Sequence, residues 1–240
     1  MAASKVRLFL NHFNEDDVVL DAGCGVGIEL NAVSTRVKYS VGLDIDLSNL
    51  RTARYLLGNK IQKIDFIRAD ICHLPFRTSS FSKILCFDVL EHLICPIKAI
   101  DGLRSILSSG GECFIRVPNK WTIGEFLLMI VSKQRRSRGL WNVRHVSFFS
   151  LKEIVNLFIN NGFCYVDGYT VGSLSLNIWT SILTIASVLL NIIFHNDYYK
   201  SRHYLSALSS FHPRAKIFFI RNTFSKMPSF YYFTIVFRSR

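Results

Sequence analysis

Val18-Val19-Leu20-Asp21-Ala22-Gly23-Cys24-Gly25-Val26-Gly27 decides the fold of this chain, because an apolar strand ends in an acid and runs directly into three alternating glycines. Glycines at alternate positions let the backbone turn tightly, and they leave no Cβ between the main chain and a bound molecule. An amphipathic run, 28–33, follows the glycines. This strand, turn and helix order predicts a loop that binds a nucleotide-type cofactor.

The spacing of the glycines argues against a dinucleotide. A dinucleotide loop separates its last two glycines by two residues, and Ile28 stands where its third glycine belongs. A glycine turn that only packs a helix on a sheet is the alternative, and the loop alone does not separate the two interpretations.

Acids end the next apolar runs as well. Asp44 closes the run 39–44, about twenty residues beyond the glycines, where an acceptor for ribose hydroxyls is expected. Asp70 and Asp88 close two further runs. Each acid taken alone is also typical of a solvated strand end, but ligands of open α/β sheets bind at the carboxyl ends of strands. Three acids in this order therefore favour a cofactor site.

The pattern Asp-x-Gly-x-Gly-x-Gly resembles motif I of the class I S-adenosylmethionine-dependent methyltransferases. The segments 74–76 (Leu-Pro-Phe), 88–93 and 145–150 are similar to those of the type 11 group, which includes quinone-precursor O-methyltransferases. The resemblance covers residues 15–170 and a final strand. It implies an α/β fold: a Rossmann-like seven-stranded sheet of order 3-2-1-4-5-7-6, with strand 7 antiparallel and helical cap insertions.

The resemblance also implies which residues contact S-adenosylmethionine. Asp44 is expected at the ribose, Asp70 at the adenine amino group and Ile71 beside the adenine ring. The full predicted set is Asp21, Gly23, Cys24, Gly25, Gly27, Asp44, Ile45, Asp70, Ile71, Phe87 and Asp88.

Glu91, His92 and His145 are the predicted catalytic residues. Some members of the resembling group hold a divalent ion on a Glu-x-x-Glu-His set plus a later histidine, but Asp88 replaces the first Glu here and shortens that side chain by one methylene. A metal is therefore not favoured, and we predict no metal ligands. His92 or His145 as general base follows from the near-neutral pKa of histidine, with a structural role as the alternative.

Composition limits the number of domains and the partners. The chain has 240 residues, enough for one α/β domain with additions, and its net charge of +12 favours anionic partners such as a membrane surface or nucleic acid. The mean hydropathy is +0.26, which indicates apolar surface with a partner. Six scattered cysteines indicate a reducing compartment, so we expect a cytoplasmic protein and leave open whether it is peripheral to a membrane.

Periodicity places the elements of a single domain, 1–240. An amphipathic lead helix is expected at 4–13, and Gly110-Gly111 is expected to end the third crossover helix. Ser150 and Glu153 form the pattern of a capping box, and Gly162 is expected to close that helix. Strands are predicted at 18–22, 39–43, 66–69, 82–87, 112–117, 163–169 and 230–237, and helices at 28–36, 48–57, 96–108 and 151–161.

Cap insertions are expected at about 119–144 and 171–228. The first joins an apolar run, 121–132, to the basic run 133–138, a pattern that fits a membrane interface, a core helix or a site for a substrate phosphate. The second begins with 171–194, which has no charged residue and a stripe of polar residues at helical spacing. Packing within the cap, contact with a membrane interface and membrane spanning all remain open for it, but spanning would separate the last strand from the sheet.

The sequence therefore predicts methyl transfer from S-adenosylmethionine to a hydroxyl group of a hydrophobic or lipid-linked small molecule at a membrane surface. A glycan or RNA acceptor, and a membrane-associated protein that binds the cofactor without turnover, are the alternatives. Neither the acceptor nor the oligomeric state follows from these residues, because specificity lies in the variable insertions.

Overall fold

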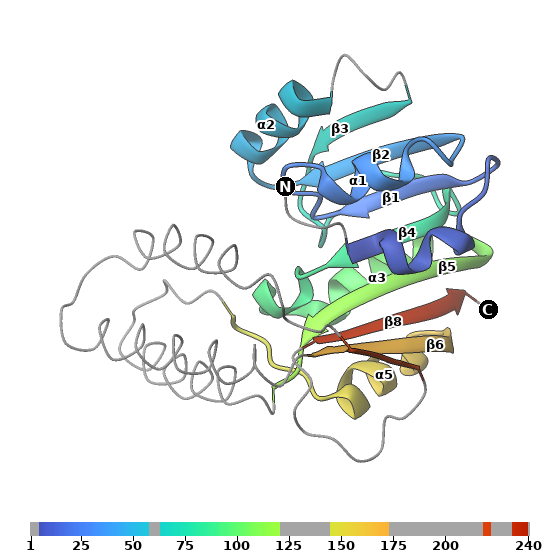
Figure 1. The fold of residues 1–240 in the computed structure, drawn as a ribbon. Coiled ribbons are helices and arrows are strands. Elements are labelled where there is room, and N and C mark those ends of the chain that lie inside the picture. The colour runs from blue at the N-terminus through green and yellow to red at the C-terminus, as the bar shows by residue number, and fades with distance from the viewer. Residues whose placement is uncertain (1–4, 58–62, 121–144, 173–217, 222–231, 240) are drawn as a thin grey trace, which may run out of the picture.

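A single mixed sheet organises the chain in the computed structural model, which describes residues 5–57, 63–120, 145–172, 218–221 and 232–239 (Figure 1). Its strands are β1 (Val18–Ala22), β2 (Tyr39–Asp44), β3 (Ile64–Arg68), β4 (Phe81–Phe87), β5 (Leu107–Pro118), β6 (Phe163–Gly172), β7 (Phe218–Arg221) and β8 (Tyr232–Ser239). They lie in the order β3-β2-β1-β4-β5-β8-β6-β7. Strands β1 to β5 pair in parallel, and β8 is antiparallel to both β5 and β6.

This topology confirms the predicted order 3-2-1-4-5-7-6, with β8 as the predicted antiparallel seventh strand. One strand was not predicted. The short β7 pairs antiparallel with β6, from Gly172↔Phe218 to Tyr169↔Arg221, and extends the sheet at its edge. It lies within the segment expected to form the second cap insertion.

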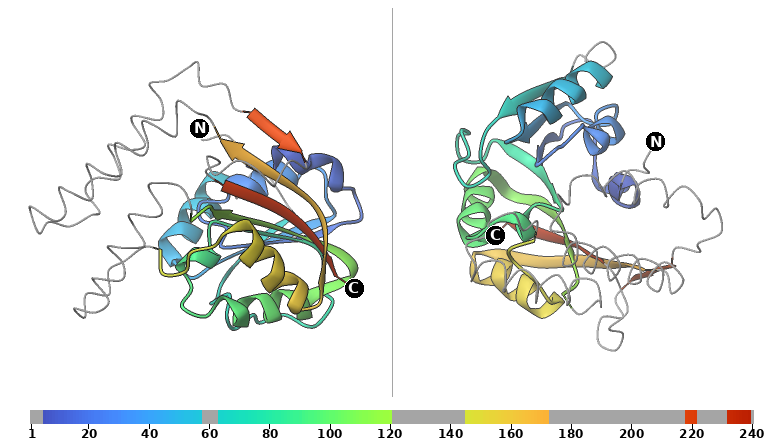
Figure 2. Two further views of the ribbon diagram at one scale, coloured as in Figure 1. Left: turned by 90° about the horizontal axis from the view of Figure 1, so that it is seen from below. Right: turned by 90° about the vertical axis from the view of Figure 1, so that its left-hand side faces the viewer.

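Helices cover both faces of the sheet (Figure 2). They are η1 (Lys5–His12), α1 (Ile28–Val33), α2 (Leu47–Leu57), η2 (Leu90–His92), α3 (Pro96–Ile106) and α5 (Leu151–Asn160). On one face, α3 and α5 pack on the largest core cluster, where Ile100 and Phe158 are fully buried. On the other face, η1 and α1 pack on a second cluster around Phe9 and Phe114. Burial on both faces explains why the central strands are almost continuously apolar.

The lead segment is a helix as predicted, but of the 3-10 type. Val6 and Phe9 are fully buried, and Phe13, just after the helix, is 7% exposed. The backbone N–H of Val6 also donates to Glu29 in the first turn of α1, at 2.9 Å. The lead segment therefore contributes to the hydrophobic core on one face of the sheet.

Two predictions of helix ends have different outcomes. The capping box at Ser150 is confirmed, since its hydroxyl accepts from the Glu153 N–H and the Glu153 carboxylate accepts from the Ser150 N–H. The prediction that Gly110 and Gly111 end the third crossover helix is wrong. That helix, α3, ends at Ile106, and both glycines lie inside β5, where the pairing with β4 shifts register.

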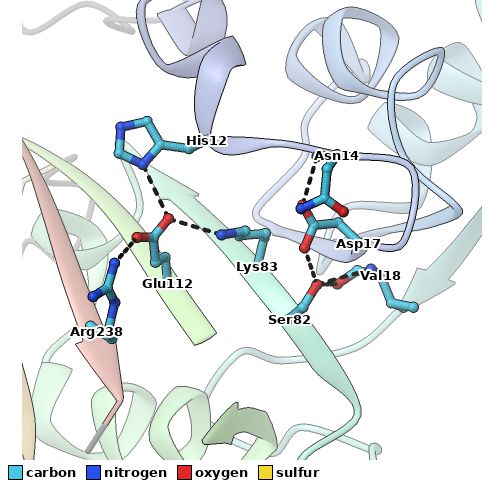
Figure 3. Close-up of polar contacts among 8 residues, drawn as sticks. All are labelled: His12, Asn14, Asp17, Val18, Ser82, Lys83, Glu112 and Arg238. Atoms are coloured by element: carbon cyan, nitrogen blue, oxygen red, sulfur yellow. Dashed lines mark hydrogen bonds and ion pairs between the residues drawn. The ribbon is translucent and has the colours of Figure 1, made fainter. Parts of the chain in front are cut away.

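Ion pairs around the buried Glu112 connect residues that are distant in the sequence (Figure 3). Lys83, Glu112 and Arg238 lie opposite one another on the neighbouring strands β4, β5 and β8. The Glu112 carboxylate contacts Lys83 Nζ at 2.9 Å, Arg238 Nη2 at 2.7 Å and His12 Nδ1 at 3.1 Å. We call these four residues the Glu112 cluster. It joins the lead segment, the central strands and the last strand.

The predictions for 121–132, 133–138 and most of 171–194 concern residues outside the described part of the chain. Val171 and Gly172 are an exception, because they belong to strand β6 and not to a helix. Within the described residues, no helix has both the length and the apolar character needed to cross a membrane.

Candidate active site

The glycine loop leaves β1 at Ala22 and enters α1 at Gly27, as the strand, turn and helix pattern predicts. Gly23, Gly25 and Gly27 all have positive φ, at 87°, 53° and 80°. A Cβ on Gly23 would lie 2.3 Å from Val89 Cγ2, so this glycine is required by packing. A Cβ on Gly25 would meet nothing within 4 Å. The backbone at Gly25 is therefore the part of the loop that a ligand can approach.

Asp44 holds this loop from the end of β2. Its Oδ2 accepts from the Gly25 N–H at 2.8 Å, and its Oδ1 accepts from the Asp46 N–H at 2.8 Å. The side chain is buried, and each oxygen keeps a further lone pair for a hydroxyl donor. This geometry fits the predicted ribose acceptor.

Asp21 and Cys24 lie beside Asp44. Asp21 is the penultimate residue of β1 and is 2% exposed. Burial raises the pKa of the Cys24 thiol well above its usual range, and the charges of Asp21 and Asp44 raise it further. The buried Cys24 side chain packs with Leu30 and Leu50, and its environment disfavours the thiolate.

Asp70 follows β3 on the same edge, since the Ala69 N–H donates to the carbonyl of Asp44 at 3.2 Å. The hydrogen bond from the Cys72 N–H, followed by that from His73, holds the pKa of Asp70 below its usual value despite partial burial. The carboxylate thus stays an acceptor, as binding of an amino group requires.

The two isoleucines of the predicted cofactor-binding set differ in burial. Ile45 is 65% exposed at the end of β2, whereas Ile71 is 6% exposed and packs in the main core. The contact of the Ile71 side chain with adenine stays a prediction.

The remaining predicted cofactor residues, Phe87 and Asp88, lie at the end of β4. Asp88 has a φ of 59°, and its Oδ1 pairs with Arg116 Nε at 3.6 Å. Its N–H also donates to the carbonyl of Arg116. Phe87 is buried in the cluster beneath η1. No sequence motif pointed to Arg116, although a charged residue in the apolar run of β5 is a signal for it.

Glu91, His92 and His145 come together, although the last is more than fifty residues from the others. One potential ligand atom from each lies within 4.8 Å of those of the other two, and the two imidazole centroids are 5.0 Å apart. The N–H groups of Val146 and Ser147 donate to the Glu91 carbonyl, which holds the later segment in place. We call these three residues the histidine cluster.

The histidine cluster lies next to the glycine loop, because Val89, which contacts Gly23, immediately precedes η2. A buried carboxylate beside two imidazoles can take up a proton, and it can also ligate a divalent ion. Asp88, which replaces the first Glu of the resembling group's ligand set, pairs with Arg116.

Comparisons with known proteins agree with this geometry. Residues 20–115 match the model of a methyltransferase domain, type 11. The YcgJ protein of Bacillus subtilis has the same fold, with a TM-score of 0.64 and 18% identity over 97% of each chain.

Two curated relatives match part of the chain. The uncharacterised protein MJ0638 of Methanocaldococcus jannaschii is 38% identical over 48% of this chain, and a ubiquinone biosynthesis O-methyltransferase of Psychrobacter arcticus is 28% identical over 62%. The matches span 48% and 60% of those relatives' own lengths.

Residues 20–115 are a type 11 methyltransferase domain. The domain belongs to the class I S-adenosylmethionine-dependent methyltransferases, as the resemblance to their motif I implied. Its residues fit that cofactor, since open space faces Gly25 and the Asp44 and Asp70 carboxylates stand at neighbouring strand ends. The assignment of individual cofactor contacts, and of catalytic roles to the histidine cluster, stays a prediction.

Proposed function

We propose that the methyltransferase domain methylates a hydroxyl group on a hydrophobic or lipid-linked small molecule at an anionic membrane surface. The histidine cluster carries the proposal, because it places proton acceptors beside the glycine loop. Removal of a proton is what a hydroxyl acceptor requires from an enzyme in addition to alignment.

S-adenosylmethionine supplies an electrophilic methyl group on a sulfonium. The chain's own residues align the acceptor and remove its proton. As the acceptor oxygen bonds to the methyl carbon, the carbon–sulfur bond breaks and its electron pair stays on sulfur. The hydroxyl proton passes to the imidazole of His92 or His145, and Glu91 stabilises the resulting imidazolium, since a buried carboxylate favours the charged form of a nearby histidine.

Three observations support a hydrophobic acceptor and a membrane surface. Ile94 and Ile97, which closely follow His92, are 81% and 47% exposed. The chain has a net charge of +12, which attracts it to anionic lipid. One relative is named for ubiquinone biosynthesis. Exposed apolar side chains on a basic protein fit an interface where a lipid-linked acceptor would be found.

Replacing each histidine tests the catalytic role. His92→Ala or His145→Ala is expected to lower kcat by about 10²- to 10⁴-fold for the residue that acts as the base. The affinity for S-adenosylhomocysteine, measured by titration calorimetry, should stay within about twofold. The matched control is His12→Ala in the Glu112 cluster, which should keep its kcat. Full turnover in both variants would show that neither histidine is the base.

A separate experiment tests which class of molecule accepts the methyl group. Methyl release is measured with lipid extract and with RNA, and pelleting is measured with phosphatidylserine vesicles in low and high salt. Turnover with lipid and salt-sensitive pelleting are expected, since salt screens attraction to anionic headgroups. Turnover with RNA alone would replace the lipid acceptor, and cofactor binding without turnover on either would favour a binding protein.

A further inference from the structure

Asp70, His73 and Lys98 form a continuous chain of polar contacts from the end of β3 to α3. His73 Nδ1 lies 3.2 Å from Asp70 Oδ2. The other ring nitrogen, Nε2, lies 2.6 Å from Lys98 Nζ. The predicted cofactor site includes Asp70 but neither of the other two residues.

The chemistry of lysine determines the protonation state of this histidine. An ammonium group has only donors, so Lys98 must donate and His73 Nε2 must accept with its lone pair. A ring whose Nε2 carries no proton is neutral and has its proton on Nδ1. His73 therefore donates from Nδ1 to Asp70, and Lys98 selects the tautomer that can do so.

This donation completes the support of Asp70. Its Oδ1 accepts from the Cys72 N–H at 2.9 Å, and the His73 N–H donates to its carbonyl at 2.8 Å. His73 contacts Oδ2, and the Cys72 side chain also interacts with the carboxylate, so all the described partners of Asp70 come from the turn that follows it. The orientation of the carboxylate is thereby restricted, although the side chain is 42% exposed.

We propose that His73, held in its Nδ1–H tautomer by Lys98, is a positioning residue that orients the Asp70 carboxylate to accept the 6-amino group of adenine. This inference rests on the proposed function only in taking Asp70 as the adenine acceptor. It makes the His73 and Lys98 pair a determinant of purine specificity, because an oriented acceptor favours a 6-amino group and disfavours a 6-oxo group, which cannot donate.

Nitrogen-15 NMR of the imidazole tests the tautomer without any ligand. The wild-type protein should show His73 with a protonated Nδ1 and an unprotonated Nε2. In Lys98→Ala, the ring should shift toward a mixture of tautomers. Lys152→Ala, which removes an exposed lysine from α5, is the control and should leave the His73 signals unchanged. A predominantly Nε2-protonated His73 in the wild type would overturn the inference.

Calorimetry with two ligands tests the specificity. S-adenosylhomocysteine carries the 6-amino group, and S-inosylhomocysteine carries a 6-oxo group in its place. His73→Ala should weaken the adenosyl ligand about 3- to 10-fold, the equivalent of one lost hydrogen bond, and leave the inosyl ligand nearly unchanged. His73→Asn, whose amide can donate to Asp70 without Lys98, should recover most of the discrimination.

Failure of the proposed function and failure of the inference about His73 give different results. If the wild-type protein binds neither ligand, the proposed function fails, while the tautomer measurement still stands on its own. If the wild type prefers the adenosyl ligand and His73→Ala keeps the same ratio of affinities, His73 is only a surface cap and this inference is wrong.

Discussion

The two ends of the sheet use carboxylates in opposite ways. At the end that carries the glycine loop, Asp44 accepts only from backbone N–H groups among the described residues, and those donors lie in adjoining loops. At the other end, Glu112 accepts from three basic side chains contributed by distant segments. The first arrangement holds a carboxylate in place without a cationic partner among the described residues, and the second places two cationic side chains and a histidine on it. The loop end has the free acceptors that the predicted cofactor site requires, and the Glu112 end joins distant segments of the fold.

The pKa of Glu112 shows the strength of the second arrangement. Burial alone would raise this pKa, but hydrogen bonds from Arg238 and Lys83, together with the charge of Lys83 and a contact from His12, outweigh burial and lower the pKa to about 2. Because the folded pKa is lower than the unfolded value of 4.5, the stabilisation is present above pH 4.5. It is lost as the pH falls from there toward 2.

The largest effect is expected from Glu112→Gln. It leaves Lys83, whose side chain is 14% exposed, without its anionic partner. The free energy of unfolding should fall by about 3 kcal/mol at pH 7, as for other buried pairs that lose one member. Urea unfolding at several pH values measures this loss. The difference between variant and wild type should shrink as the pH falls from about 4.5 to 2.

Glu15→Gln is the matched control, since Glu15 is exposed and precedes β1. It should change the unfolding free energy by less than about 0.5 kcal/mol. A Glu112→Gln variant as stable as this control would mean that the two ends of the sheet do not differ in the way described.

The next largest effect is expected from Asp44→Ala, and it concerns binding. Loss of the acceptor for ribose hydroxyls and of the support for Gly25 should weaken S-adenosylhomocysteine about 100-fold, given the strength of hydrogen bonds to charged groups. Calorimetry measures the affinity, and Asp46→Ala, two residues away and exposed, should change it less than about twofold. Unchanged affinity in Asp44→Ala would remove the ribose assignment.

The loop end was more predictable from the sequence than the Glu112 end. Asp21, Gly25 and Asp44 stand in a local pattern whose spacing reports a strand, a turn and the next strand end. The approach of His145 to His92 was expected only from the resemblance to a family. Contacts between residues so far apart in the sequence depend on which segments return to the same edge of the sheet, and a local pattern does not specify this.

No local pattern in the sequence indicated the Glu112 cluster. Lys83, Glu112 and Arg238 meet because β8 inserts between β5 and β6 with one particular register, and no local pattern specifies that register. The same dependence on strand register explains why the helix end predicted at Gly110 and Gly111 was wrong. A glycine pair is typical of a helix end, but here it accommodates a shift in strand pairing.

Two glycines give the smallest and most direct test of the comparison. Gly25 in the loop and Gly110 in β5 both have positive φ, 53° and 73°, and a Cβ on either would meet nothing within 4 Å. Gly25→Ala and Gly110→Ala should therefore cost similar amounts of stability, about 1 kcal/mol each, from backbone strain alone. Thermal unfolding without S-adenosylhomocysteine measures this loss of stability, and unfolding with the ligand measures how much the ligand stabilises each variant.

Only Gly25→Ala should also weaken the ligand, by about 10-fold, because its methyl group would enter the space beside the Asp44-bound backbone. Ligand-induced stabilisation should thus fall in Gly25→Ala and persist in Gly110→Ala, since the stabilisation at a fixed ligand concentration grows with the logarithm of the affinity. Equal responses of the two variants would mean that the open space at Gly25 is not where the cofactor lies, and the site would have to be sought along the ends of β4 and β5.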